Sequence, residues 1–273
     1  MINILKNTYY RLKQINDDIG LVAIRNISEN INPFKNCYNI ILRDQYVKLT
    51  NNDIKDLDDE VKKLLKNLYD GKYYYIPYHG LNSMNIYFYI KIDPLNYNIK
   101  SSKTIREIKY NEELIIDKID FSKFKITDKK QNVIKNLKKT YCKLGKSYTH
   151  GVGVITIKDI PKNTNPFIIT DNRCYNYNGI QIKKKLLEQL DSEILKMIYD
   201  FISPLNDLYY IPSYGIDSLN ITFYLNNSLD PNLSVISDGC EYLGFKTKRN
   251  IHKGEELFIN YEDYKTYFNE IID

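Results

Sequence analysis

The side chains best suited to chemistry lie in three short motifs of the second half of the chain. The first is Gly151-Val152-Gly153, where the missing side chains let a bound molecule approach the backbone closely. The second is Asn226-Asn227-Ser228, which offers hydrogen-bond donors and acceptors. The third ends on Tyr261, whose hydroxyl can both donate and accept. Groups of these types bind and orient an organic ligand.

Metal and thiol chemistry are not indicated. The cysteines show no Cys-x-x-Cys spacing, and the histidines are not clustered with them. They are Cys37, Cys142, Cys174 and Cys240. We expect isolated, reduced thiols in an intracellular protein, with no zinc site and no disulfide framework.

The order and spacing of the three motifs resemble a SET domain, the fold of S-adenosylmethionine-dependent protein-lysine methyltransferases. The specific part is Asn-x-Ser-x-x-Pro-Asn at residues 226–232, followed by Gly-Glu-Glu-Leu-x-x-x-Tyr at residues 254–261. A lone Gly-x-Gly would be weak evidence. The resemblance covers about residues 137–261.

The resemblance implies a mostly β, α+β fold of small curved sheets with a C-terminal pseudoknot. Its last segment would thread under a loop and bring Tyr261 beside the Asn-x-Ser strand. It assigns S-adenosylmethionine contacts to Gly151, Val152, Gly153, Asn226 and Asn227. Tyr261 would line the lysine channel and also contact the cofactor.

The chemistry implied is displacement of a methyl group from a sulfonium by a lysine amine, so alignment matters most. The amine must first lose its proton, and an apolar aromatic channel lowers its pKa from about 10.4 by disfavouring the cation. We therefore assign Tyr261 to orientation and electrostatics rather than to general-base catalysis.

Two features depart from the family pattern. Asn227 stands where the family usually has His, from which we expect reduced cofactor affinity. No Cys-x-Cys zinc flank follows Tyr261. The aromatic residues after it are expected either to wall the channel or to pack as an amphipathic helix; they are Tyr264, Tyr267 and Phe268. Tyr175 and Tyr177 are further candidates for the channel; the alternative is that they are aromatic residues on the surface.

The two halves of the chain match in order, which favours a duplication. Residues 20–34 read GLVAIRNISENINPF and residues 153–167 read GVITIKDIPKNTNPF. Residues 75–77 and 210–212 both read Tyr-Ile-Pro, and 112–114 and 255–257 both read Glu-Glu-Leu. We expect a degenerate SET-like repeat at 1–117, a linker at 118–136 and the SET domain at 137–273.

The first repeat has lost the site residues. Asp18 stands two positions before Gly20, and Lys118 takes the place of Tyr261. The strand near residues 90–94 lacks the Asn-Ser pair. This repeat is expected to dock against the second or to hold the substrate.

Local patterns predict strands alternating with one main helix in each half. The predicted strands cover residues 21–24, 86–90, 154–157, 221–225 and 256–261. The predicted helices cover residues 58–69, 131–139 and 191–202, the last with a cap at 191–192.

The leading hypothesis is a protein-lysine N-methyltransferase acting on a histone or another lysine-rich protein, in the cytoplasm or nucleus, including that of a host cell. The alternative is a catalytically inactive SET-like protein-binding module. The net charge of +5 and the lack of a basic stripe with interleaved aromatics do not predict nucleic-acid binding. No apolar run reaches the roughly 18 residues that cross a bilayer. The target lysine, the degree of methylation and the oligomeric state are not predicted.

Overall fold

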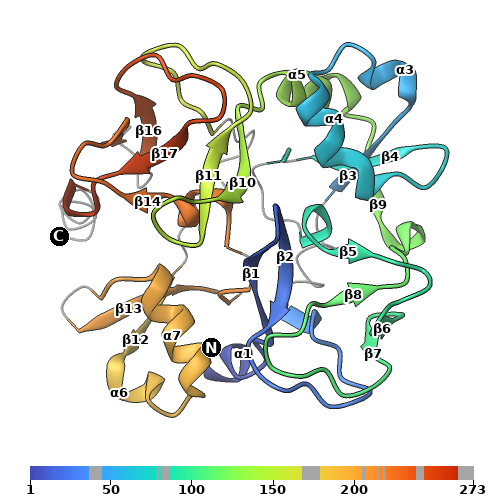
Figure 1. Cartoon of the computed structure of the whole chain (residues 1–273), viewed down its shortest axis with the longest axis vertical. Coiled ribbons are helices and arrows are strands. Elements are labelled where there is room, and N and C mark those ends of the chain that lie inside the picture. Colours follow the sequence, from blue (N-terminus) through green and yellow to red (C-terminus); the bar gives the residue numbers. More distant parts are fainter. Residues whose placement is uncertain are drawn as a thin grey trace.

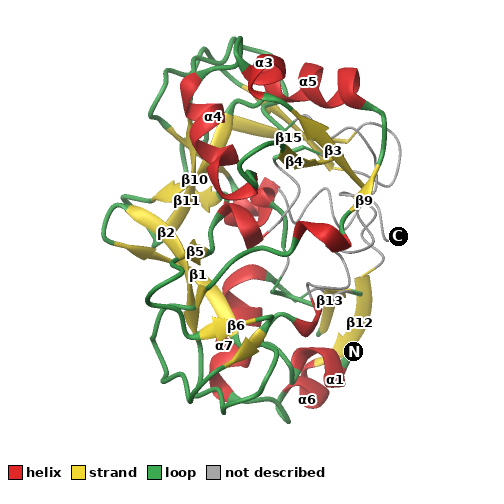
Figure 2. Ribbon diagram, turned by 90° about the vertical axis from the view of Figure 1, so that its right-hand side faces the viewer, coloured by secondary structure: helices red, strands yellow, loops and turns green. Residues whose placement is uncertain are grey.

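A computed structural model describes residues 1–36, 45–78, 80–81, 86–167, 179–204, 207–213, 215–217, 219–237 and 243–263. Over these residues the chain forms several small β-sheets with short helices beside them (Figures 1 and 2). The architecture is mixed α+β and rich in strands, as expected. No helix in the described ranges is long and apolar enough to span a membrane.

The first half contains a hairpin, a three-stranded sheet and a four-stranded sheet. The hairpin follows α1 (Ile2–Leu5) and joins β1 (Tyr10–Ile15) to β2 (Asp18–Ala23). The three-stranded sheet has the order β4-β3-β9 and consists of β3 (Gln45–Leu49), β4 (Tyr74–Pro77) and β9 (Lys125–Ile126). The four-stranded sheet has the order β5-β8-β6-β7 and consists of β5 (Lys91–Ile92), β6 (Ile99–Lys100), β7 (Lys103–Thr104) and β8 (Ile115–Ile116).

The second half contains a four-stranded sheet and two hairpins. The sheet has the order β10-β11-β17-β14 and consists of β10 (Cys142–Lys146), β11 (Val152–Thr156), β14 (Asn226–Asn227) and β17 (Glu256–Ile259). One hairpin pairs β12 (Gly179–Lys183) with β13 (Leu208–Pro212), and α6 (Lys184–Leu187) follows β12. The other pairs β15 (Leu233–Ser237) with β16 (Leu243–Thr247).

The predicted helices are confirmed, and local chemistry explains their ends. The helix expected over 58–69 is α4 (Asp59–Leu65) continued by the 3-10 helix η1 (Lys66–Leu68), after the short α3 (Asn51–Ile54). The helix expected over 191–202 is α7 (Ser192–Phe201). Each begins at an aspartate cap: the carboxylates of Asp58 and Asp191 accept the backbone N–H of Glu60 and Glu193, respectively.

Two predicted strands are wrong. Residues 86–90 and 221–225 contain the 3-10 helices η2 (Ile86–Phe88) and η5 (Ile221–Tyr224) instead. A short apolar run does not distinguish a buried strand from a buried helical turn. At η5 the side chain of Asn220 caps the helical turn, because its Oδ1 accepts from Thr222 N at 2.9 Å and from Thr222 Oγ1 at 2.5 Å.

Residues 118–136, expected as a linker, pack onto the first half. They contain η3 (Phe121–Lys123), β9 and most of α5 (Lys130–Lys138). Phe121 stacks on Tyr75 with ring centroids 4.5 Å apart, and Phe124 stacks on Tyr46 at 4.1 Å. The segment therefore adds the edge strand β9 to the three-stranded sheet and contributes side chains to the core.

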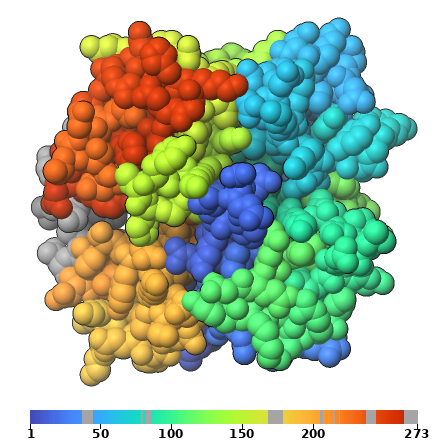
Figure 3. All heavy atoms as spheres, in the orientation of Figure 1, coloured from blue at the N-terminus to red at the C-terminus, as the bar shows by residue number. Residues whose placement is uncertain are grey.

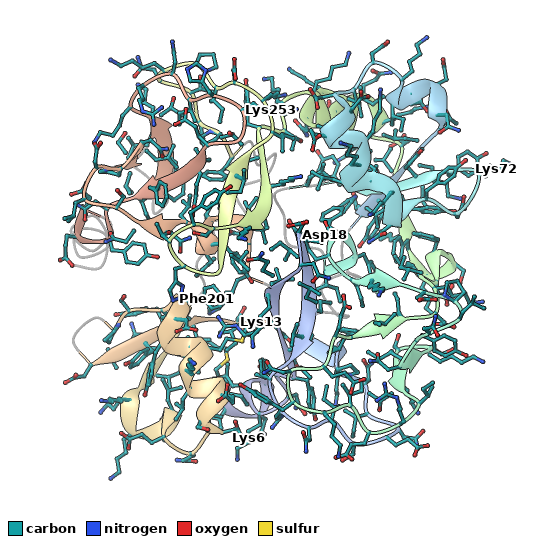
Figure 4. All side chains as sticks on the ribbon, viewed as in Figure 1. Lys6, Lys13, Asp18, Lys72, Phe201 and Lys253 are labelled. Carbon is teal, nitrogen blue, oxygen red and sulfur yellow. The ribbon has the colours of Figure 1, made fainter. Side chains whose placement is uncertain are left out.

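The two halves contact each other reciprocally. Helix α4 of the first half reaches β10, where Glu60 pairs with Lys143 at 3.4 Å. Helix α7 of the second half reaches β1, where Asp200 pairs with Arg11 at 2.9 Å. Figure 4 shows Lys13 and Phe201 near this second contact, and Figure 3 shows the β1–β2 hairpin (dark blue) between segments of both halves. One hydrophobic cluster includes buried residues of both.

Candidate functional site

Strand β17, the last in the described chain, lies inside its sheet between β11 and β14 (Figure 1). It pairs antiparallel with β11, Leu257 opposite Val154. It pairs in parallel with β14, Ile259 opposite Asn227. This strand order brings together the glycine turn, the asparagine strand and Tyr261, which are far apart in the sequence.

The outer edge of β14 is open in the described part of the chain, where no strand pairs with it. The N–H of Ser228 donates to the carbonyl oxygen of Ile259 at 2.9 Å, which faces this residue toward β17. Alternate residues of a strand direct their backbone amides to opposite sides. The backbone N–H and C=O of Asn227 therefore point away from β17, where they are able to pair with a planar ligand edge.

Tyr261 is held across the end of β14. Its backbone N–H donates to Asn227 Oδ1 at 2.8 Å, and its hydroxyl donates to the carbonyl oxygen of Leu225 at 2.9 Å. Burial raises the pKa of the Tyr261 phenol above its ordinary value, although the residue is 39% exposed. The hydroxyl is therefore protonated at neutral pH.

The glycine turn contains two glycines with different roles. Gly151 has φ +62°, which favours glycine, and an added Cβ there would meet open space. A Cβ on Gly153 would stand 2.8 Å from Cδ of Glu256 and 3.1 Å from Nδ2 of Asn226. Packing inside the protein thus requires Gly153 to lack a side chain. Val152, between them, begins β11.

The SET domain family profile matches residues 151–262, which include all of these elements. Residues 151–262 form a SET domain. Proteins with this domain are typically protein-lysine methyltransferases that bind S-adenosylmethionine and act on lysine-bearing proteins. The predicted family is thus confirmed for this part of the chain.

A comparison of structures finds similarity to a humanized mutant of the Chaetomium thermophilum Polycomb Repressive Complex 2 bound to an inhibitor. The identity is 22% and the TM-score 0.31, over 49% of this chain and 16% of that chain. This chain therefore spans about a sixth of the length of the matched chain. The comparison with curated proteins finds no match.

The SET domain also contains a buried polar cluster that the sequence did not predict. Glu256, 7% exposed, accepts from Ser147 Oγ at 3.0 Å and from Asn226 Nδ2 at 2.7 Å. Asn226 further donates to Ser147 Oγ at 3.1 Å and, more weakly, to the carbonyl oxygen of Val152 at 3.4 Å. The Gly-Glu-Glu-Leu motif contains Glu256, but only the fold shows where its carboxylate points.

Asn232 fixes β17 to the asparagine loop of the SET domain. It is buried; its Nδ2 donates to Glu256 O at 2.8 Å, and its Oδ1 accepts from Phe258 N at 2.8 Å. A single side chain thus satisfies two backbone groups of β17 that β14 leaves unpaired.

Of the cysteines and of the aromatic residues considered for the channel, apart from Tyr261, one lies within the described residues and the others do not. Cys142 is buried, which raises the pKa of its thiol and keeps it protonated. In the described ranges no three or more His, Cys, Asp or Glu residues are grouped to hold a metal ion. The other candidates lie outside the described residues; they are Cys37, Cys174, Tyr175, Tyr177, Cys240, Tyr264, Tyr267 and Phe268.

The positions of the first half that the predicted duplication would align with this cluster have different chemistry. Glu113 lies beside Gly20, with Oε1 3.0 Å from the place of an added Cβ. Its partner is Lys91, at 3.9 Å. Ile15 Cδ1 lies 2.5 Å from the same Cβ position, so an apolar side chain covers Gly20. Among the described residues, the atoms closest to an added Cβ on Gly20 thus belong to Ile15 and Glu113, and not to a serine–asparagine–glutamate cluster.

Proposed function

We propose that this SET domain is a protein-lysine N-methyltransferase that uses S-adenosylmethionine. The observation that carries the proposal is the junction of Asn227 and Tyr261 at the open edge of β14. There the two motifs most specific to the family meet through a 2.8 Å hydrogen bond. A fold alone does not establish an activity, so the proposal depends on this arrangement.

The residues at this edge fit an adenosyl cofactor. The backbone N–H and C=O of Asn227, which point away from β17, suit a planar base that carries a donor beside an acceptor. The open space at Gly151 allows a ligand to lie against the turn. We assign cofactor binding to the backbone of Gly151, Val152 and Gly153, to Asn226 and Asn227, and to a contact with Tyr261. When bound, the cofactor supplies a methyl group made electrophilic by its sulfonium.

Tyr261 would act by orientation. Its hydroxyl proton is committed to Leu225 O, so the oxygen lone pairs remain free to accept weak C–H···O contacts. A phenol whose pKa lies above its usual value does not take a proton from lysine at neutral pH. The substrate amine would therefore lose its proton to solvent before it meets the methyl group.

The experiment is methyl transfer from radiolabelled S-adenosylmethionine to histones and to other lysine-rich proteins, with calorimetry of cofactor binding alongside. We expect cofactor binding, and label on lysine. Lack of cofactor binding by the folded 273-residue chain would end this proposal.

The second candidate is an inactive SET-like module that binds a partner protein. It is favoured by Asn227, whose side-chain oxygen is occupied by the N–H of Tyr261. It predicts partner binding without turnover and no effect of Tyr261→Ala on that binding. Capture of a lysine peptide without label transfer would favour it over the enzyme.

We also propose a duplication, with a degenerate SET-like copy over residues 1–117, a connecting segment over 118–136 and the SET domain over 137–273. Strand pairing supports it: β5 and β8 are parallel with Lys91 opposite Ile115, as β14 and β17 are with Asn226 opposite Phe258. An antiparallel hairpin precedes each pair, β1–β2 in one half and β10–β11 in the other.

Side-chain bonds support the duplication further. Asn98 Nδ2 donates to Glu113 O at 2.7 Å, and its Oδ1 accepts from Ile115 N at 2.8 Å. Asn232 makes the same two bonds in the SET domain. Each half also has an ion pair at the turn before β8 or β17: Arg106 pairs with Glu112, and Arg249 pairs with Glu255. The first copy would serve to dock against the second or to hold the substrate.

A further inference from the structure

The carboxylate of Glu256 fills the space beneath the glycine turn of the SET domain. The residue is buried, and an added Cβ on Gly153 would overlap its Oε1. Among the described residues no cation pairs with it. Such a carboxylate is tolerated when neutral donors satisfy its oxygens.

Those donors come from two segments, the loop that leads into the glycine turn and the first residue of β14. Ser147 Oγ donates to Oε2 at 3.0 Å, and Asn226 Nδ2 donates to Oε1 at 2.7 Å. The Ser147 oxygen then accepts the backbone N–H groups of Thr149 and His150, both at 3.0 Å. Glu256 thus joins the loop at residues 147–151 to the first residue of β14.

We propose that Glu256 is a positioning residue that fixes the glycine turn relative to β14 and so forms the S-adenosylmethionine site. It acts through Ser147 and Asn226, because its own carboxylate lies beneath the turn and not at the open strand edge. The link to cofactor binding rests on the proposed function. The link to the conformation of the turn does not.

The first half provides a matched control at Glu113. This glutamate lies two residues before β8, whereas Glu256 begins β17, and it too lies beside a glycine, Gly20. It pairs with Lys91 at 3.9 Å instead of joining a serine to an asparagine. Its removal perturbs a partly exposed glutamate that also lies beside a glycine, far in sequence from the segments assigned to the cofactor.

The experiment compares Glu256→Ala, Glu256→Gln and Glu113→Ala in the 273-residue chain. The measurements are S-adenosylmethionine affinity by calorimetry, thermal unfolding, and hydrogen exchange of peptides that cover residues 147–153. We expect Glu256→Ala to weaken cofactor binding by on the order of tenfold, the effect of losing hydrogen bonds to a charged group. Exchange over 147–153 should accelerate.

Glu256→Gln should rescue both properties to within roughly threefold of the unmodified chain, since the amide still accepts from Asn226 and donates to Ser147. Glu113→Ala should lower the unfolding temperature but leave cofactor affinity and exchange over 147–153 unchanged. If the effect came from a general loss of packing, Glu256→Ala and Glu113→Ala would instead change cofactor affinity and exchange alike.

The outcomes are distinguishable. Wild-type cofactor affinity or unchanged exchange in a folded Glu256→Ala variant overturns the positioning role. Equal losses in Glu256→Gln and Glu256→Ala overturn the hydrogen-bonded link. If the unmodified chain does not bind S-adenosylmethionine but Glu256→Ala still accelerates exchange, the methyltransferase proposal fails and the positioning of the turn stands.

Discussion

The hydroxyl of Tyr261 donates a 2.9 Å hydrogen bond to the carbonyl oxygen of Leu225, the residue just before β14. The closing tyrosine is thereby fixed at both ends, since its backbone N–H is bound to Asn227. A rigidly held phenol orients groups around it at little entropic cost. This relationship makes the hydroxyl itself testable.

Tyr261→Phe removes that hydrogen bond and keeps the ring. We expect methyl transfer to fall by on the order of tenfold or the number of methyl groups added to change, with cofactor affinity nearly unchanged. Mass spectrometry of the methylated lysine and steady-state rates measure this. Tyr69→Phe is the matched control, because Tyr69 also donates to a backbone carbonyl, that of Gly71, at 2.7 Å. Equal rates for the Tyr261 variant and the unmodified enzyme would contradict the assigned role.

Asn227→Ala removes the acceptor for the N–H of Tyr261. We expect a loss of about 1 kcal/mol in local stability and weaker binding of S-adenosylmethionine, because the helical turn at residues 261–263 loses its attachment to β14. Asn227→Asp keeps the acceptor and should bind the cofactor more tightly than the alanine variant. Calorimetry measures both affinities, and a better binder in Asn227→Ala than in Asn227→Asp would refute this explanation.

Asn232→Ala removes the donor to the carbonyl of Glu256, in a buried bond, and the acceptor for the N–H of Phe258, in a part-buried one. We expect a decrease of about 2–6 kcal/mol in the free energy of unfolding, since each of the two groups that loses its partner costs about 1–3 kcal/mol. Urea denaturation measures it. Asn98→Ala breaks the two equivalent bonds in the first half and should destabilise by a similar amount. Only the Asn232 variant should also lose cofactor affinity, and the same loss in both would argue against a single functional copy.

Stability should depend on pH through Asp217. Burial raises the pKa of this carboxyl from 3.8 to about 7, and its Oδ1 has no hydrogen-bond partner in the described structure. It lies between the halves, where its Oδ2 is 3.5 Å from Asn36 Nδ2 and its backbone carbonyl accepts from Tyr10. The folded chain holds this proton more tightly than the unfolded chain does, so stability falls as pH rises from about 4 to about 7.

The expected decrease across that range is on the order of 3–4 kcal/mol. Asp217→Asn should remove it and be more stable than the unmodified chain at pH 8, as urea denaturation at pH 5 and pH 8 would show. Asp200→Asn is the control, because Asp200 makes a partly exposed ion pair with Arg11. An unchanged pH dependence in Asp217→Asn would assign the effect to another group.

Local chemistry in the sequence was enough to predict the family and the main helices. The Asn-x-Ser-x-x-Pro-Asn and Gly-Glu-Glu-Leu motifs identify the SET domain at residues 151–262. Apolar spacing and the aspartates at 58 and 191 define α4 and α7, because helix periodicity and capping depend on residues only a few positions apart. The cofactor and channel assignments remain predictions.

Tertiary structure decided which distant residues meet. The sequence contains Gly153 and Glu256 but does not state that one lacks a side chain to make room for the other. It also misled at residues 86–90 and 221–225, which contain 3-10 helices instead of strands, the second of them capped by the side chain of Asn220. Strand order is set by non-local pairing and by the packing of whole faces, so the place of β17 between β11 and β14 emerges only when the chain is folded.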